Sequence, residues 1–223
     1  MRTLLSISLL MLVLIAGGCG HFSRHKGVKG SGKREVQKRE ISPFTTIQTE
    51  GAFNIEVVCQ KDLGLEVEGD DNILPLITTE VSNGTLYLKN SKSYSVSQPI
   101  TFRITAPNLE ALAVTGAGKI AIKGMNNEKF EIDSDGAPTI DVAGSTKLID
   151  IDANGAGKID AHKLEAARGV IASKGVCKVE VDVVDQLDVT VSGPSSVTYQ
   201  GNPTINKTIN GPGKVERRVT EGA

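Results

Sequence analysis

The sequence contains very few aromatic residues. Among its 223 residues there is no Trp, and Phe and Tyr together make up 4%. A core built on large rings is therefore not expected, and neither is a sugar-binding surface lined with them. The apolar 39% of the chain consists mainly of Val, Ile, Leu and Ala, which suits a thin aliphatic core.

Histidine and cysteine are also scarce, with three of each. His162 stands far from His21 and His25, so the sequence predicts neither a zinc site nor a Ser-His-Asp triad, and no cofactor is expected. Cys59 falls in an alternating strand pattern on the apolar side, where a thiol packs as a small apolar group. An oxidising compartment would permit a disulfide between Cys59 and Cys177, although no feature of the sequence favours it.

The chain has no apolar run long enough for a spanning helix. Its longest run, Leu4 to Ile15, has about 12 residues against the ~20 that a bilayer requires. Preceded by Arg2 and followed by Ala16-Gly17-Gly18-Cys19, this run resembles a bacterial lipoprotein signal over residues 1–19, with Ala16 where a larger aliphatic residue is usual. We therefore expect lipidation at Cys19 and attachment to a membrane. An ordinary cleaved signal with an incidental cysteine is the alternative.

Positive charge is concentrated after this segment. Residues 20–40 carry seven Lys and Arg against two Glu, whereas residues 41–223 have a net charge of −7. With almost no apolar residues, 20–41 is predicted to be a flexible basic tether, which either lies on anionic head groups or is a solvated spacer. Because the segment lacks interleaved aromatics, we do not expect it to bind nucleic acid.

A glycine recurs through the second half of the chain. Units such as Gly-Ala-Gly-Lys-Ile begin at positions that are 20, 19, 20, 18 and 18 residues apart. The six first glycines, which we interpret as structural turn positions, are Gly116, Gly136, Gly155, Gly175, Gly193 and Gly211. A period this short and regular is typical of a solenoid.

Apolar residues recur at fixed distances from these glycines. The position four residues after each glycine is always aliphatic, from Ile120 in the first unit to Val215 in the last. Each unit is therefore predicted to be one coil with two short strands on either side of a glycine corner of positive φ. Stacking would turn the apolar positions into continuous ladders, and Lys207 and Arg217 at core positions mark the last unit as a cap. The predicted fold is an all-β, right-handed parallel β-solenoid (β-helix) with coils of about 18–20 residues.

The first half of the folded body is less regular. Between residues 42 and 108 we expect strands at 46–49, 53–59, 63–67, 85–88 and 99–105, with Asn83-Gly84 as a hairpin-type turn. The stretch 73–77 reads as one helical turn or a packed loop. Residues 109–217 then form the repetitive part, and 218–223 a C-terminal tail.

Together these features resemble the head GIN domain family of bacterial exported proteins, many of them lipoproteins and named as autotransporter-type adhesins. The resemblance covers residues 43–217 and rests on these segments: Gly51 with Phe53-Asn54-Ile55, Asp71-Asn72, Leu86 to Leu88, Pro107 to Leu112, and the serial glycine units. It implies a right-handed parallel β-solenoid and an adhesin-like role.

Two charge patterns suggest candidate chemistry. Asp133, Asp135 and Asp152 fall on stacked coils where they could share a cation such as Ca²⁺, although solvated acidic faces are the commoner outcome. A second pattern places Lys119, Lys158, Lys178 and Lys214 three residues after the glycine, and it places Asp141, Asp160 and Glu180 five after. These side chains should face outward and compensate one another.

The expected function is binding without catalysis. We expect an exported, lipid-anchored cell-envelope protein, most simply an outer-membrane lipoprotein of a Gram-negative bacterium, that recognises a protein or glycan. One alternative is a carbohydrate-active enzyme, which would need a groove with two carboxylates and an aromatic platform. Another is a structural protein that homo-oligomerises through exposed solenoid ends.

Overall fold

The protein is built almost entirely of β-strands, as the sequence predicts. The computed structural model describes residues 27–218, and in this range the only helical element is the short 3-10 helix η1 (Leu74–Leu76). No helix in the described range is long and apolar enough to cross a membrane. The N-terminal strands are β1 (Val28–Lys29), β2 (Arg34–Lys38), β3 (Thr46–Cys59), β4 (Gly64–Asp70), β5 (Ile77–Ser82), β6 (Thr85–Asn90), β7 (Tyr94–Ser95) and β8 (Thr101–Ala106).

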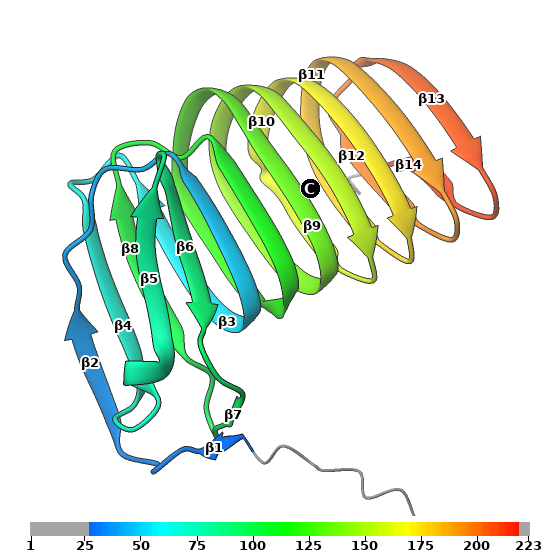
Figure 1. Ribbon diagram of the computed structural model, residues 1–223. Coiled ribbons are helices and arrows are strands. Elements are labelled where there is room, and N and C mark those ends of the chain that lie inside the picture. Colours follow the sequence, from blue (N-terminus) through cyan, green and yellow to red (C-terminus); the bar gives the residue numbers. More distant parts are fainter. Residues whose placement is uncertain (1–26, 219–223) are drawn as a thin grey trace, which may run out of the picture.

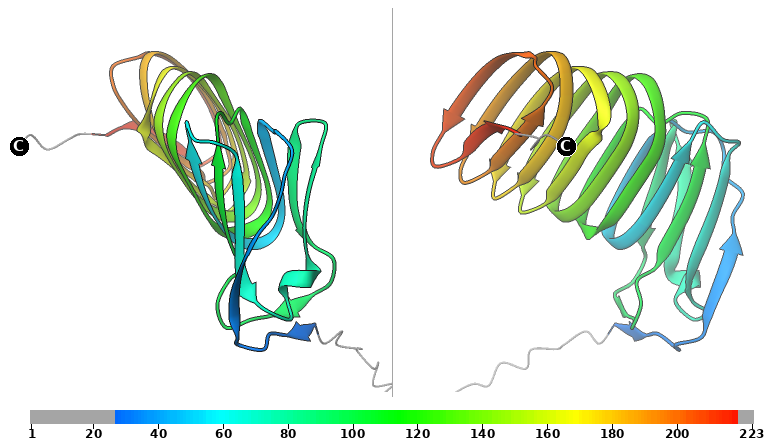
Figure 2. Two further views of the ribbon diagram at one scale, coloured as in Figure 1. Left: turned by 90° about the vertical axis from the view of Figure 1, so that its left-hand side faces the viewer. Right: turned by 180° about the vertical axis from the view of Figure 1, so that it is seen from behind.

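The second half of the chain winds in parallel coils along one axis (Figures 1 and 2). Its strands are β9 (Ala111–Gly155), β10 (Lys158–Gly175), β11 (Lys178–Ser192), β12 (Ser196–Gln200), β13 (Thr204–Asn210) and β14 (Lys214–Arg217). All pairings among them are parallel, and β3 pairs in parallel with β9 at the start of the series. We call β3 together with β9–β14 the coil stack.

Aliphatic ladders fill the interior of the coil stack, which confirms the predicted apolar columns. Ile140, Ile159, Val179, Val197 and Val215 lie opposite one another in successive registers, and all are buried. Burying one such side chain contributes about 1.5–3 kcal/mol, so each coil is stabilised mainly by contact with its neighbours.

The last coil departs from this pattern in the predicted way. Lys207 lies opposite Val189, and Arg217 lies opposite Tyr199. Both side chains occupy positions that face the core in earlier coils, but at the C-terminal end they are exposed to solvent. Charged side chains at such positions discourage another strand from pairing with this end.

Glycine occupies one corner of every coil with positive φ, which confirms the turn prediction. Values range from 88° at Gly193 to 131° at Gly136 among the six predicted positions. A seventh corner comes earlier than predicted: Gly51, with φ of 125°, lies opposite Gly116. The coil series therefore begins in β3, and the expected boundary at residue 109 is wrong for that strand. The insertion carrying β4–β8 separates the first two corners and hides the period.

The insertion covers the N-terminal end of the coil stack. The outer edge of β3 pairs in parallel with β6 at Thr46–Thr49 and with β8 at Asn54–Cys59, while β4 and β5 add antiparallel strands outside them. The predicted Asn83-Gly84 turn joins β5 to β6, with φ of 50° and 75°. Phe53 of β3 and Phe102 of β8 pack edge to face, with ring centroids 5.2 Å apart.

The flexible tether predicted for residues 20–41 is wrong from residue 27 onward. Strand β1 pairs with β7, and β2 pairs antiparallel with β4. The basic side chains are used as hydrogen-bond donors: Arg39 donates to the carbonyls of Ile77 at 2.7 Å and Leu74 at 3.0 Å. Composition underestimated the order because backbone pairing and charge-assisted hydrogen bonds need no apolar side chains. Residues 20–26, the signal segment 1–19 with Cys19, and 219–223 lie outside the described residues.

Both cysteines in the described range are free and buried. A disulfide between Cys59 and Cys177 is therefore not formed. The Cys59 sulfur lies 3.5 Å from the Met125 sulfur in the core, which confirms that it acts as a small apolar filler.

Candidate functional site

A long groove of about 800 Å³ runs along the coil stack at the corners opposite the glycines. Five consecutive corners contribute to it, within 108–111, 126–131, 145–147, 165–167 and 184–185, and Thr46 of β3 closes one end. Its lining residues are Thr46, Asn108, Glu110, Ala111, Asn126, Asn127, Glu128, Lys129, Glu131, Ser145, Thr146, Lys147, Glu165, Ala167, Val184 and Asp185.

The strand pairing is irregular at the later corners of the groove, where β10 pairs with β9 and β11. The register between β10 and β11 shifts between Ala161 and Glu165 and again between Ala166 and Arg168. A further shift separates Asp160 from Lys163 in the pairing with β9. Such bulges turn the backbone and re-aim side chains, so polar residues at these corners leave the ladder and line a depression.

The charges of the groove are only partly compensated. Lys129 forms ion pairs with Glu131 and, at 3.7 Å, with Asp150, and the hydrogen bond to Glu131 raises the pKa of Lys129. Lys147 pairs with Glu128 at 2.7 Å. The remaining carboxylates, Glu110, Glu165 and Asp185, have no cationic partner among residues 27–218. The groove therefore has excess negative charge toward both ends.

Amide groups and hydroxyls supply the rest of the polar lining. Asn127 donates from Nδ2 to the Leu109 carbonyl at 2.6 Å, which fixes its side chain across two coils. Its Oδ1 is shielded from solvent and has no hydrogen-bond partner in the described chain. A buried acceptor without a partner is costly, and because it is shielded from solvent a ligand in the groove does not reach it.

No aromatic residue lines the groove, and its apolar members are only Ala111, Ala167 and Val184. The groove does contain several carboxylates. The aromatic platform required by the carbohydrate-active alternative is not among the groove's lining residues.

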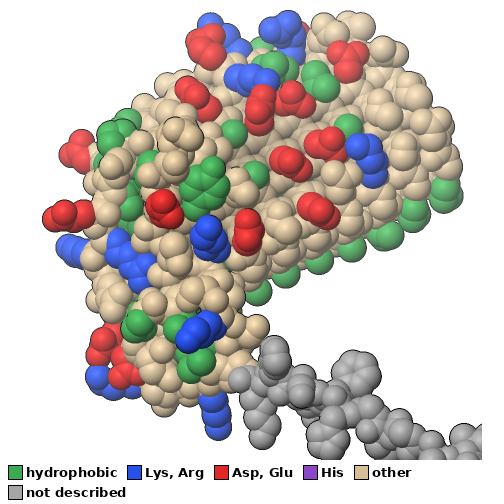
Figure 3. Space-filling model, in the orientation of Figure 1, with side chains coloured by type: hydrophobic (Ala, Val, Ile, Leu, Met, Phe, Trp, Pro, Cys, Tyr) green, Lys and Arg blue, Asp and Glu red, His purple; other side chains and the backbone are tan. Residues whose placement is uncertain are grey.

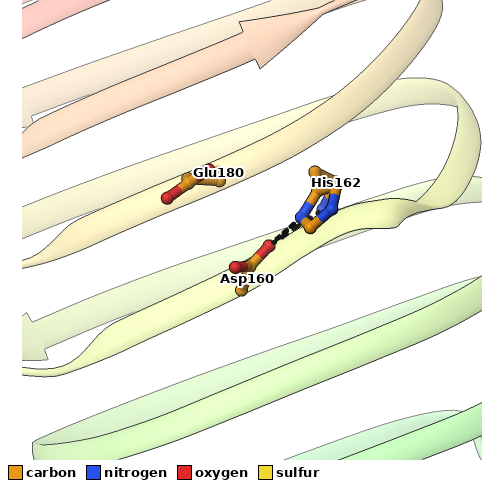
Figure 4. A group of neighbouring side chains, drawn as sticks. All are labelled: Asp160, His162 and Glu180. Atoms are coloured by element: carbon orange, nitrogen blue, oxygen red, sulfur yellow. Dashed lines mark hydrogen bonds and ion pairs between the residues drawn. The ribbon is translucent and has the colours of Figure 1, made fainter.

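A second cluster of polar side chains lies outside the groove, on the strands that follow the glycine corners. Ligand atoms of Asp160, His162 and Glu180 all lie within 4.8 Å of one another (Figure 4). Asp160 and His162 are two residues apart on β10 and hydrogen-bond to each other, while Glu180 of β11 lies opposite Asp160. Sequence reasoning treated His162 as isolated. Asp160 and His162 are two positions apart in a strand, so the sequence could have indicated that their side chains lie on the same side. That Glu180 lies beside them follows only from the register between β10 and β11.

Carboxylate and imidazole ligands suit a metal such as Zn²⁺, but cations of the protein already compensate these carboxylates. Lys158 lies 2.8 Å from Asp160 and 3.9 Å from Glu180. Glu180 also pairs with Lys178 at 2.8 Å and with Arg218 at 3.3 Å. A divalent ion would add to three positive charges on two carboxylates, so the arrangement is better explained as an ion-pair network.

This network confirms the predicted pairing of lysines with acids on alternate positions, with one difference. Burial opposes ionisation of Asp160, but hydrogen bonds from Lys158 and His162 outweigh it and lower the pKa of Asp160 to about 2. Glu180 is 8% exposed, so the pairs around it are less solvated than the sequence suggested.

The predicted cation candidates Asp133, Asp135 and Asp152 belong to β9, on the stretches that precede the glycine corners Gly136 and Gly155. Asp133 and Asp135 are exposed, and Asp152 pairs with Lys174 at 3.6 Å. Within residues 27–218, these three acids do not form a group of converging ligand atoms comparable to Asp160, His162 and Glu180. Calcium binding there stays a prediction.

The glycine corners form a third kind of surface. A row of hydrophobic side chains follows the lower edge of the coil stack in Figure 3. The residue after each corner glycine is apolar and exposed: Ala52, Ala117, Ala137, Ala156, Val176, Pro194 and Pro212. The coil stack thus presents a polar groove on one edge, an apolar line on the other, and two charged faces between them.

The family model described as "Putative auto-transporter adhesin, head GIN domain" matches residues 43–203, which is most of the chain. No curated protein matches the chain.

Several solved structures share the fold. A "putative adhesin" from Bacteroides fragilis is 25% identical with a TM-score of 0.73, and the match covers 86% of this chain and 100% of that one. A "putative lipid binding protein" and a "putative adhesin" from Parabacteroides distasonis are each 20% identical with TM-scores of 0.50. These two matches cover 86% of this chain and 99% of theirs. The latter two support the fold alone.

Proposed function

Because the chain belongs to the head GIN domain family, described as "Putative auto-transporter adhesin", we propose that it is an adhesin-like binding protein of the cell envelope, without catalysis of its own. In this proposal the coil stack is a right-handed parallel β-solenoid with coils of about 18–20 residues. It serves as a rigid support that presents a ligand-binding surface. The signal-like segment and Cys19 make the protein a lipid-anchored outer-membrane lipoprotein of a Gram-negative bacterium.

The observation that carries the proposal is the groove across five corners. Its walls belong to strands held by continuous aliphatic ladders, so the backbone that carries the lining side chains is fixed before a ligand binds. The exposed carboxylates Glu110, Glu165 and Asp185, which have no cationic partner among residues 27–218, give it charge that a ligand can compensate. An enzyme acting on polysaccharides is less favoured because no aromatic side chain lines the groove.

Binding can be tested with paired charge-reversal variants. In the groove variant, Glu165→Lys and Asp185→Lys reverse two exposed carboxylates. The matched control, Asp62→Lys and Glu80→Lys, reverses two exposed carboxylates outside the groove that likewise have no ion-pair partner in the described chain. Retention of purified protein on envelope fractions should fall for the groove variant and persist for the control. Equal retention of wild type and both variants would remove the groove from the function.

The anchor is tested separately. Intact mass of the mature membrane-extracted protein should show acylation that disappears in Cys19→Ser. An unmodified N-terminus in the wild type would eliminate lipid anchoring while leaving the groove proposal in place.

A further inference from the structure

The groove has dimensions that suit an extended chain. Neighbouring coils in a β-structure lie about 4.8 Å apart, so five corners span roughly 19 Å from the first to the last. An extended peptide rises about 3.3 Å per residue, and six residues therefore cover this length.

The charge distribution indicates which peptide would fit. Glu110 belongs to the first corner and Glu165 to the fourth, and neither carboxylate has a cationic partner among the described residues. Three coil spacings separate them by roughly 14 Å, close to the ~13 Å between residues i and i+4 of an extended strand. Residues i and i+4 also point to the same side, so two basic side chains at this spacing can reach both carboxylates at once.

Between these ends the groove is suited to peptide groups and not to further charge. Lys129 and Lys147 are held by Glu131 and Glu128, which leaves the middle of the groove near neutral. Asn126 and Ser145 are exposed in this region, where their amide and hydroxyl groups can hydrogen-bond the N–H and C=O groups of an extended backbone.

From this geometry we infer that the groove recognises an extended segment of a partner protein carrying two Lys or Arg residues four positions apart. The inference rests on the proposed binding function and specifies its ligand. A neutral glycan could donate hydroxyl hydrogen bonds to the carboxylates at the ends, but it carries no positive charge to compensate them. Its sugar rings would meet Ala111, Ala167 and Val184 without any aromatic platform.

The test uses the full chain and fluorescent ten-residue peptides of Ser and Thr that carry two Lys residues. Spacings of two, four and six residues are compared, with a two-Glu peptide as the charge control, by fluorescence anisotropy at 20 and 300 mM NaCl. The four-residue spacing should bind most tightly, and the higher salt should weaken it severalfold.

Variants connect the binding to the groove. Glu110→Gln and Glu165→Gln should each weaken the four-spaced peptide about fivefold, since each removes one ion pair of about 1 kcal/mol. Glu80→Gln, outside the groove, should change affinity less than twofold. Circular dichroism of each variant verifies that the fold is retained.

The alternative outcomes are distinguishable. Equal affinity for all spacings, or unchanged binding by the Gln variants, would overturn the peptide assignment. Groove-dependent binding on a glycan array without peptide binding would overturn it too, while supporting the proposed function. Equal envelope retention of the wild type and both charge-reversal variants would instead remove the groove from the proposed function, whichever peptides bind.

Discussion

Replacing the corner glycine Gly136 with Ala tests the central physical feature of the fold. Gly136 has φ of 131°, a conformation that is strained for any residue with a Cβ. A Cβ at this position would also meet the backbone of Gly116 in the preceding coil, lying 2.9 Å from its carbonyl carbon and 3.0 Å from its nitrogen, with the carbonyl oxygen closer still. Backbone atoms cannot rotate away as a side chain can, so two adjacent coils would have to separate.

The size of the effect follows from two contributions. Backbone strain at such a φ costs about 1–3 kcal/mol. Forcing an extra methyl group into a packed interface costs about 1–3 kcal/mol more. Restricting the unfolded chain recovers about 0.4–1 kcal/mol. We therefore expect Gly136→Ala to lower the free energy of unfolding by roughly 3–4 kcal/mol. With a denaturant dependence of about 2 kcal/mol per M of urea, the unfolding midpoint should fall by roughly 1.5–2 M.

Gly84→Ala is the matched control. Gly84 also has positive φ, at 75°, but no heavy atom lies within 4 Å of the position a Cβ would take. Only the conformational cost of about 1–2 kcal/mol remains, so the midpoint should fall by about 0.5 M or less after the gain from the unfolded state. Urea unfolding of both variants followed by far-ultraviolet circular dichroism makes the comparison. Equal midpoints would refute the argument that close contact between coils, and not φ alone, requires glycine at the corner.

Three further predictions concern the rest of the molecule. Asp160→Asn should destabilise the protein by about 2 kcal/mol at pH 7, because the pKa of Asp160 is lowered to about 2 from an ordinary 3.8. The stabilisation by the ionised Asp160 carboxylate is fully present above about pH 4, and it is lost as the pH falls through about 2. The urea unfolding midpoints of wild type and variant should therefore converge between pH 4 and pH 2. A constant difference between the two midpoints would contradict the lowered pKa of Asp160. Arg39→Met should lower stability by about 2 kcal/mol by leaving the Leu74 and Ile77 carbonyls without their donor. Hydrogen exchange should then accelerate in residues 34–38, and unchanged protection there would show that Arg39 does not hold this segment. Burial raises the pKa of the Cys59 thiol to about 11, so iodoacetamide at pH 8 should label its peptide only after urea is added, as read by mass spectrometry. Rapid labelling of the native protein would contradict that burial.

Much of the fold was predictable from local patterns. A glycine with an aliphatic residue four positions after it is repeated six times, and in the first five units another aliphatic residue stands four positions before it. Apolar residues at Ile159 and Val179 must be buried together because neither coil can cover its own apolar face. The binary pattern therefore identified the ladders and the exposed charges at Lys207 and Arg217 without a structure.

Other features depend on pairings that no local pattern contains. Gly51 belongs to the first coil only because β3 lies beside β9, across an insertion that interrupts the period. The basic segment of β2 is ordered because β4 offers a matching edge about thirty residues away, so composition alone misjudged it. His162 was read as isolated because Glu180 approaches it only through the register of β10 and β11.

The groove shows most clearly which features follow from the sequence pattern and which require the tertiary structure. Each of its polar residues is unremarkable in its own stretch of sequence, and successive corners lie about twenty positions apart along the chain. The repeating glycines and apolar positions determined by themselves that the chain would stack, since burial of aliphatic surface requires it. Only the stacked structure decided which corners align, where the bulges turn side chains outward, and which carboxylates remain without a cation. These three features depend on the registers between coils and not on the sequence pattern within a single coil.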